Sequence, residues 1–88
     1  MNKNLQIKDQ RITFRFQAMI LAGYRTYKAL SMAVEEDIGE RVSYQSFHKV
    51  MLGEFIKGPK AEAMIASVSR LLELPVKTLW PEIDELAA

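Results

Sequence analysis

Cysteine is absent from the sequence and histidine occurs once, as His48, and these two scarcities exclude several kinds of chemistry. A chain without cysteine forms no disulfide and offers no thiolate to a metal or a substrate. His48 belongs to no HExxH pattern and forms no recognisable catalytic set with its sequence neighbours. We therefore expect no enzymatic activity, no catalytic residues, no metal site and no cofactor.

Motifs for nucleotides and membranes are missing as well. Residues 53–60, GEFIKGPK, contain glycine and lysine without the spacing of a phosphate-binding loop, and no Rossmann pattern occurs. No apolar run approaches the roughly 20 residues that span a bilayer, and MNKNLQIKDQ at the start carries no signal-peptide core. The expectation is a cytoplasmic protein with no membrane contact and no evident small-molecule substrate.

What is present suits one globular domain. The chain has 88 residues, of which 49% are hydrophobic and 26% charged. The net charge is only +1, but residues 1–60 hold ten Lys and Arg against six Asp and Glu, whereas residues 61–88 hold two against five. This asymmetry fits a domain that turns its N-terminal helices toward phosphates, and a chance fluctuation explains it equally well.

Apolar spacing and capping residues predict an all-α fold, a compact bundle of four to five short helices. The first helix is expected from Asp9, as its cap, to about Ala22. Its apolar stripe comprises Ile12, Phe16, Met19, Ile20 and Gly23. Arg11 and Arg15 lie one turn apart on the more polar side, where they either meet a phosphate or stay solvated, and the solvated arrangement is slightly favoured.

Three further helices follow. Thr26 is a plausible cap for a helix that runs to about Asp37, and residues 39–42 form a turn. Ser43 caps a short helix ending near Gly53, with Phe47, Val50 and Met51 on its buried side. Pro59 starts a fourth helix with an apolar stripe of Ala61, Met64, Ile65, Val68, Leu71 and Leu72.

The expected organisation is a flexible arm at residues 1–8, one helical domain at residues 9–81, whose function is taken up below, and an acidic tail at residues 82–88. Within the arm, residues 4–8 are candidates for a short extended segment. Near the end of the domain, Leu79 and Trp80 are expected to pack back on the core.

The short third helix carries the functional hypothesis, because its exposed face is polar. A Gln amide pairs with adenine and a Lys ammonium reaches guanine acceptors in the major groove, so Gln45 is the best candidate base reader and Lys49 reads a base or holds a phosphate. Tyr44 is expected against the sugar-phosphate or a thymine methyl, and His48 is an auxiliary donor. Ser43 and Ser46 are candidates for phosphate contacts at the helix start. A polar-faced helix without any ligand is about equally compatible with these residues alone.

The segment VSYQSFHKVMLGE, residues 42–54, combines a small N-cap, a polar pair, a buried aliphatic residue and a closing glycine. With these features, the chain from Gly23 to Trp80 resembles the lambda-repressor-like helix-turn-helix family, which includes phage Cro proteins and repressors. LLELPVKTLWPE, residues 71–82, is similar to the closing helix and Trp-Pro ending of Ner-like phage regulators. The chain departs from the family upstream, where Ala33 to Gly39, followed by Glu40 and Arg41, is several residues longer.

The resemblance implies that residues just after the N-cap enter the major groove, which here are Tyr44, Gln45, Ser46, His48 and Lys49. It also makes Arg41 and Lys28 candidates for phosphate contacts. The implied function is sequence-specific binding of double-stranded DNA by a transcriptional regulator, a repressor of phage or mobile-element type.

A protein-interaction module, such as an antitoxin or an adaptor, is the alternative. It would use the acidic corner at residues 35–40 or the apolar side of the fourth helix. A DNA-binding module of this size is expected to form a homodimer that reads half-sites about 34 Å apart. The fourth helix and the Trp80 region are the expected dimer contact, while residues 1–8 are an arm that follows the DNA backbone.

Overall fold

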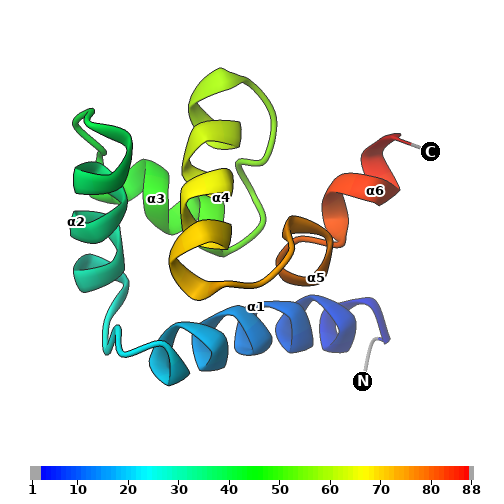
Figure 1. Cartoon of the computed structure of the whole chain (residues 1–88). Helices are drawn as coiled ribbons and strands as arrows, with labels where there is room; N and C mark the ends of the chain where they lie inside the picture. Colours follow the sequence, from blue (N-terminus) through cyan, green and yellow to red (C-terminus); the bar gives the residue numbers. More distant parts are fainter. Residues whose placement is uncertain (1–2, 88) are drawn as a thin grey trace.

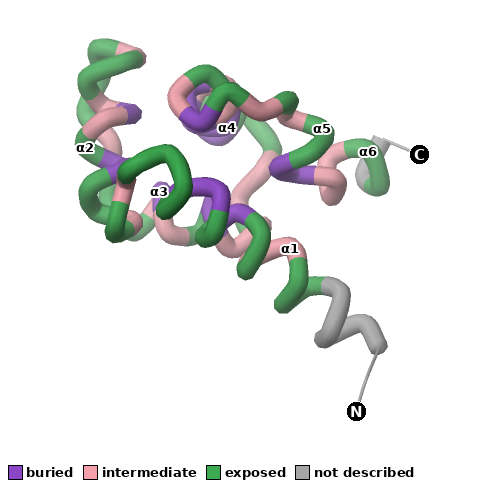
Figure 2. The backbone as a smooth tube through the Cα atoms, turned by 60° about the horizontal axis from the view of Figure 1, so that its bottom comes forward, coloured by how far each residue is buried: buried purple, intermediate pink, exposed green. Residues whose placement is uncertain are grey.

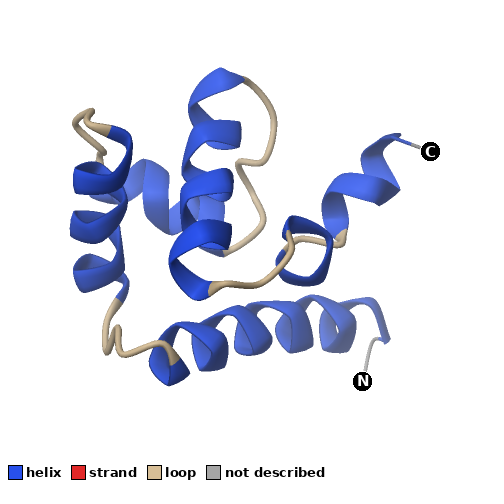
Figure 3. Cartoon of the chain, in the orientation of Figure 1, coloured by secondary structure: helices blue, strands red, loops and turns tan. Residues whose placement is uncertain are grey.

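Six α-helices make up most of the chain that the structure describes (Figures 1 and 3). In this computed structural model the backbone is described for residues 3–87 and the side chains for residues 8–85. The helices are α1 (Lys3–Leu21), α2 (Tyr27–Ile38), α3 (Tyr44–Met51), α4 (Pro59–Leu72), α5 (Val76–Leu79) and α6 (Glu82–Ala87). No strand forms within residues 3–87, so the predicted all-α fold class is confirmed.

The starts of α2 and α3 are capped as predicted. Thr26 Oγ1 accepts a hydrogen bond of 3.0 Å from the amide of Ala29, and Ser43 Oγ accepts one of 3.4 Å from the amide of Ser46. Helix α2 ends at Gly39, whose φ of 70° is the left-handed conformation that favours glycine at this position. The turn between α2 and α3 therefore falls at the predicted residues.

Helix α4 is the centre of the fold, because it packs on α2, α3 and α5 (Figure 1). It buries most of the predicted stripe: Ala61, Met64, Ile65, Val68 and Leu72. These side chains are therefore unavailable to a partner, so an expected dimer contact on this helix could not use its apolar stripe. The radius of gyration, 12.4 Å, is close to the roughly 12 Å typical of one compact domain of this length.

Helix α1 differs from the prediction in its start and in its buried face. It begins at Lys3, so residues 3–8 are helical rather than an extended arm, and Asp9 is no N-cap. Of the predicted apolar stripe only Met19 is buried, together with Arg15 and Ala18. Phe16 and Ile20 keep 40% and 41% of their surface exposed.

The C-terminal segment also differs from the predicted acidic tail, because it is helical and packs on the domain. Leu79 and Trp80 are fully buried, as predicted. Helix α6 follows at once, and its residue Ile83 packs against the hydrophobic core. The acidic stretch from residue 82 therefore belongs to the folded domain instead of trailing from it.

Candidate functional site

The C-terminal end of α3 is fixed to the rest of the molecule by two side-chain donors. Arg15 Nε donates to the carbonyl of Met51 at 2.8 Å, and the indole Nε1 of Trp80 donates to the carbonyl of Val50 at 2.9 Å. The last carbonyls of a helix have no partner within the helix, and a cation is favourable at that end of the helix dipole. These two contacts therefore hold α3 in place from behind.

Arg15 is the most unexpected residue in this arrangement, because its side chain is completely buried. Its Nη1 donates to the carbonyl of Leu79 at 2.9 Å and to Glu82 at 3.0 Å, and the guanidinium lies 5.4 Å from the centre of the Trp80 ring. Burial lowers the pKa of the Arg15 guanidinium, while the Glu82 carboxylate opposes that shift. The expectation that Arg15 stays solvated or meets a phosphate is wrong.

Arg11 is also engaged within the molecule. It forms an ion pair with Glu85 of α6. Hydrogen bonding from Arg11 lowers the pKa of the Glu85 carboxyl. The two arginines of α1 thus connect this helix to the acidic residues of α6.

Buried and exposed residues alternate along α3 (Figure 2). Phe47, Val50 and Met51 are fully buried and dock the helix on the core. Gln45 and Lys49, one turn apart, are both exposed on the opposite side. The helix therefore combines a rigid attachment with a polar face directed to solvent.

One flank of this face is aromatic. The rings of Tyr27 and His48 have centroids 5.4 Å apart, and those of Tyr44 and His48 are 5.9 Å apart. Phe16 of α1 continues the row, 5.6 Å from Tyr27. His48 is half-buried in this row, and its Nδ1 is buried with no hydrogen-bond partner among the described residues. Tyr44 is more accessible, with 48% of its surface exposed.

The other flank is a small hollow with two cations at its wall. It measures about 20 Å³, and its lining includes Arg41 and Ser43 from the turn, Ser46 of α3 and Lys60 from the first turn of α4. Glu40 also lines it, so the charge there is mixed. Lys60 was not among the predicted site residues, because nothing in the sequence places the start of α4 beside the turn before α3.

Lys28 is exposed on the first turn of α2, next to Tyr27. Its side chain makes no ion pair among the described residues. The structure thus gathers six of the predicted site residues, Ser43 to Ser46 with His48 and Lys49, on α3 and its cap. Arg41 adjoins them across the hollow, and Lys28 stands on a separate helix.

The predicted acidic corner at residues 35–40 is largely used inside the fold. Glu35 Oε1 accepts a hydrogen bond of 2.8 Å from the amide of Val42. The Asp37 carboxylate accepts hydrogen bonds from Arg70 at 2.6 Å and from Ser67 at 2.7 Å. Both bonds lower the pKa of Asp37, and the bond from Arg70 has the larger effect. The carboxylates at 35 and 37 therefore brace the turn before α3 rather than form an open acidic surface.

Comparison with models of protein families, with curated proteins and with solved structures finds no match to this chain. Function is therefore inferred from the site itself. In the described part of the chain, no helix is long and apolar enough to cross a membrane. No group of three His, Asp or Glu side chains among the described residues is placed to hold a metal ion.

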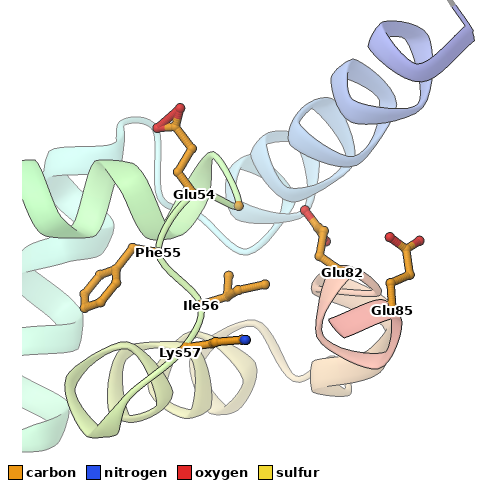
Figure 4. A pocket seen from close by; sticks show the side chains of 7 residues that line it. Glu54, Phe55, Ile56, Lys57, Glu82 and Glu85 are labelled. Carbon is orange, nitrogen blue, oxygen red and sulfur yellow. The ribbon is translucent and has the colours of Figure 1, made fainter. Parts of the chain in front are cut away.

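A larger hollow, about 510 Å³, lies away from α3 between residues 53–57 and α6 (Figure 4). Ile56 and Lys57 extend toward α6, whereas Phe55 points the other way. Its two carboxylates on α6, those of Glu82 and Glu85, already pair with Arg15 and Arg11. The hollow is open, and its lining adds only the exposed Glu54 and Lys57 of opposite charge, so we do not assign it as the recognition surface.

Proposed function

We propose that this chain binds double-stranded DNA sequence-specifically through the exposed face of α3 and acts as a transcriptional regulator. One observation carries the proposal: α3 is anchored from behind by Arg15 and Trp80 while Gln45 and Lys49 point to solvent. A rigidly mounted helix with a polar face is what the major groove accommodates, since it is wide enough for one α-helix. Helix-turn-helix geometry is part of this proposal, with α2 as the supporting helix and α3 as the reading helix.

The roles of the residues follow from their positions. Gln45 is the proposed base reader, because its amide pairs in a bidentate way with adenine. Lys49 reads a guanine or holds a phosphate, and Tyr44 contacts the backbone or a thymine methyl. Arg41 and Lys60 are proposed as phosphate contacts beside the capped start of α3, where amides and cations both favour an anion.

Two copies of the chain are proposed to read two half-sites, because one small module buries little DNA surface. A role as repressor of phage or mobile-element type depends on the sequence resemblance alone. The alternative of a protein-interaction module has less support, since the α4 stripe is buried and Glu35 and Asp37 of the acidic corner are bonded internally, which leaves Glu36 and Glu40 exposed there.

The test is selection of duplexes from a random pool at two salt concentrations, followed by sequencing of the retained fraction. The wild-type chain is expected to enrich a short motif. Gln45→Ala is expected to lose about 1 to 3 kcal/mol of binding free energy and to relax preference at one base pair. Lys77→Ala on α5, which is exposed and not part of the α3 face, serves as the matched control and keeps the wild-type motif. Retention of no duplex, or an identical motif from Gln45→Ala, contradicts the proposal.

A further inference from the structure

Exposed apolar side chains are concentrated on α1. Among residues 8–85, six large hydrophobic residues remain exposed, and four of them, Phe14, Phe16, Ile20 and Leu21, belong to this helix. Leu21 is the extreme case, with 88% of its surface exposed. Exposed apolar residues gathered on one helix mark a contact surface more often than isolated ones do.

The exposed side of α1 from Gln10 to Leu21 carries no charge. Its exposed residues are Gln10, Thr13, Phe14, Phe16, Gln17, Ile20 and Leu21. The two charged residues in this range, Arg11 and Arg15, are paired with Glu85 and Glu82. A charged ligand finds no complementary group here, whereas a second copy of the same surface meets it without like-charge repulsion.

The spacing along this side suits a paired helix. Gln10, Phe14, Gln17 and Leu21 follow one another at intervals of four, three and four residues, which places them in one stripe. At one end of the stripe Leu21 projects. At the other end lies a hollow of about 170 Å³, lined by Gln10, Arg11 and Phe14 of α1, by Thr78 and Leu79 of α5 and by Pro81. The charge of Arg11 at this hollow is paired with Glu85.

We propose that α1 pairs antiparallel with α1 of a second copy of this chain, so that Leu21 of each copy enters the hollow beside Gln10 and Phe14 of the other. A projection and a hollow on the same stripe are self-complementary only about a two-fold axis, which is the commonest symmetry of protein dimers. In this register Gln10 faces Leu21 and Phe14 faces Gln17. The contact is confined to α1 and the adjoining hollow of each copy, so the dimer dissociates on dilution.

This pairing leaves the proposed DNA-reading surface uncovered. Phe14 and its hollow are on the α5 flank of α1, whereas Phe16 contacts Tyr27 on the flank that leads to α3. The biological role of the dimer rests on the proposed function, since two DNA half-sites require two copies of the chain. The pairing itself is argued from α1 and is measured without DNA.

The first test is sedimentation of the full chain over a concentration series in the absence of DNA. The wild type is expected to dimerise, and Leu21→Asp is expected to raise the dimer dissociation constant at least about tenfold. Met32→Asp is the matched control, because Met32 is 62% exposed on α2 and outside the stripe. A wild type that is monomeric at every concentration, or a Leu21→Asp dimer as stable as that of the wild type, overturns the proposal.

The second test fixes the register by cross-linking, which the natural absence of cysteine makes clean. The double variant Gln10→Cys/Leu21→Cys is expected to form covalent dimers on mild oxidation. In the proposed register, the cysteine at position 10 of one copy faces the cysteine at position 21 of the other. The two positions are about 16 Å apart along one helix, so neither a bridge within one copy nor a bridge between identical positions is possible. Each single variant is therefore expected to stay unlinked, and efficient linkage of a single variant overturns the antiparallel register.

DNA retention of the same variants separates this inference from the proposed function. A wild type that dimerises through α1 but retains no duplex leaves the pairing intact and removes the DNA proposal. A wild type that enriches a motif but never dimerises removes the pairing and leaves DNA binding intact.

Discussion

The half of the molecule formed by α2, α3 and α4 is built by different means from the half formed by α1, α5 and α6. In the first half, hydroxyl caps start α2 and α3, and aliphatic stripes meet in the core. In the second half, a fully buried cation, Arg15, connects α1 to α5 and α6 through Leu79 and Glu82, and it also reaches the end of α3 at Met51. Local sequence pattern accounts for most of the first half, where Asp37 adds polar bonds to Ser67 and Arg70, whereas a long-range polar network is central to the second.

The second half also matters for the proposed function, because it holds α3 of the first half in place. Arg15 and Trp80 donate to the carbonyls at the end of α3, the helix proposed to read DNA. The face of α3 that meets solvent is therefore positioned by residues that never touch the proposed ligand. Loss of these contacts is expected to affect stability first and recognition as a consequence.

The largest expected effect comes from Arg15→Ala, which removes the buried cation. Glu82 then loses its partner while only 17% of its side chain is exposed, and the carbonyls of Met51 and Leu79 lose their donor. We expect the free energy of unfolding, measured with urea, to fall by about 3 to 5 kcal/mol. Arg11→Ala, which breaks the exposed pair with Glu85, is the control and costs far less. Equal losses in the two variants would contradict a structural role specific to Arg15.

The next effect compares two glycines of the first half, of which Gly53 contacts the second half and Gly39 does not. Both adopt the left-handed conformation, with φ of 78° at Gly53 and 70° at Gly39. A Cβ at Gly39 meets no atom within 4 Å, so Gly39→Ala is expected to cost only the conformational penalty of about 1 to 2 kcal/mol.

At Gly53 a Cβ would lie 2.5 Å from Glu82 Oε2 and 3.1 Å from Arg15 Nη2. Gly53→Ala must therefore displace the Glu82 carboxylate from Arg15, and we expect it to cost at least about 1 kcal/mol more than Gly39→Ala. Thermal or urea unfolding of the two variants measures the difference. If Gly39→Ala is the more damaging of the two, the close approach at Gly53 is not a constraint on the fold.

The structure of the first half could be predicted from the sequence to a greater extent than that of the second. The caps at Thr26 and Ser43, the start of α4 at Pro59 and the burial of Trp80 were all predicted, because each depends on neighbours within one or two turns. The buried side of α3 was predicted for the same reason. Its polar side followed as the complement, which is why the structure brings most of the predicted site residues together on α3 and its cap.

The buried face of α1 was not predictable in this way. Periodicity treated Arg15 as polar surface and Phe16 as core, although the structure buries the first and leaves 40% of the second exposed. The partners that stabilise Arg15 are 36, 64 and 67 residues away in the sequence. Lys60 was missed for a related reason, since only the packing of α4 places it beside the turn before α3.

A smaller effect is expected on DNA binding, and it tests whether the hollow beside α3 contacts a phosphate. Lys60→Ala is expected to make the dependence of the logarithm of the binding constant on the logarithm of salt concentration shallower by about 0.9, because one phosphate contact is lost. Titration of a retained duplex at several salt concentrations measures this slope. Lys77→Ala removes the same charge from α5 in the other half and is expected to keep the wild-type slope. Equal changes in both variants would assign the effect to net charge instead of to the hollow beside α3.

The smallest expected effect is on acid stability, where each half contributes one ion pair. The pKa of Asp37 is lowered by Arg70 and Ser67, and the pKa of Glu85 is lowered by Arg11, from ordinary values of 3.8 and 4.5. Because the folded pKa values lie below the unfolded ones, the unfolded chain binds more protons in acid. The stabilisation is therefore complete above about pH 4.5 and is lost as the pH falls through the folded pKa values.

Urea unfolding at a series of pH values tests this assignment. Asp37→Asn is expected to remove the part of the acid dependence that belongs to the α2–α4 half, and Arg70→Ala is expected to remove the same part, because the two residues act as a pair. Glu85→Gln and Arg11→Ala are expected to behave in the same way for the pair between α1 and α6. The double variant Asp37→Asn/Glu85→Gln tests both pairs together. If its free energy of unfolding fell with decreasing pH as much as that of the wild type, other carboxylates would cause the acid response, and neither ion pair would contribute to it.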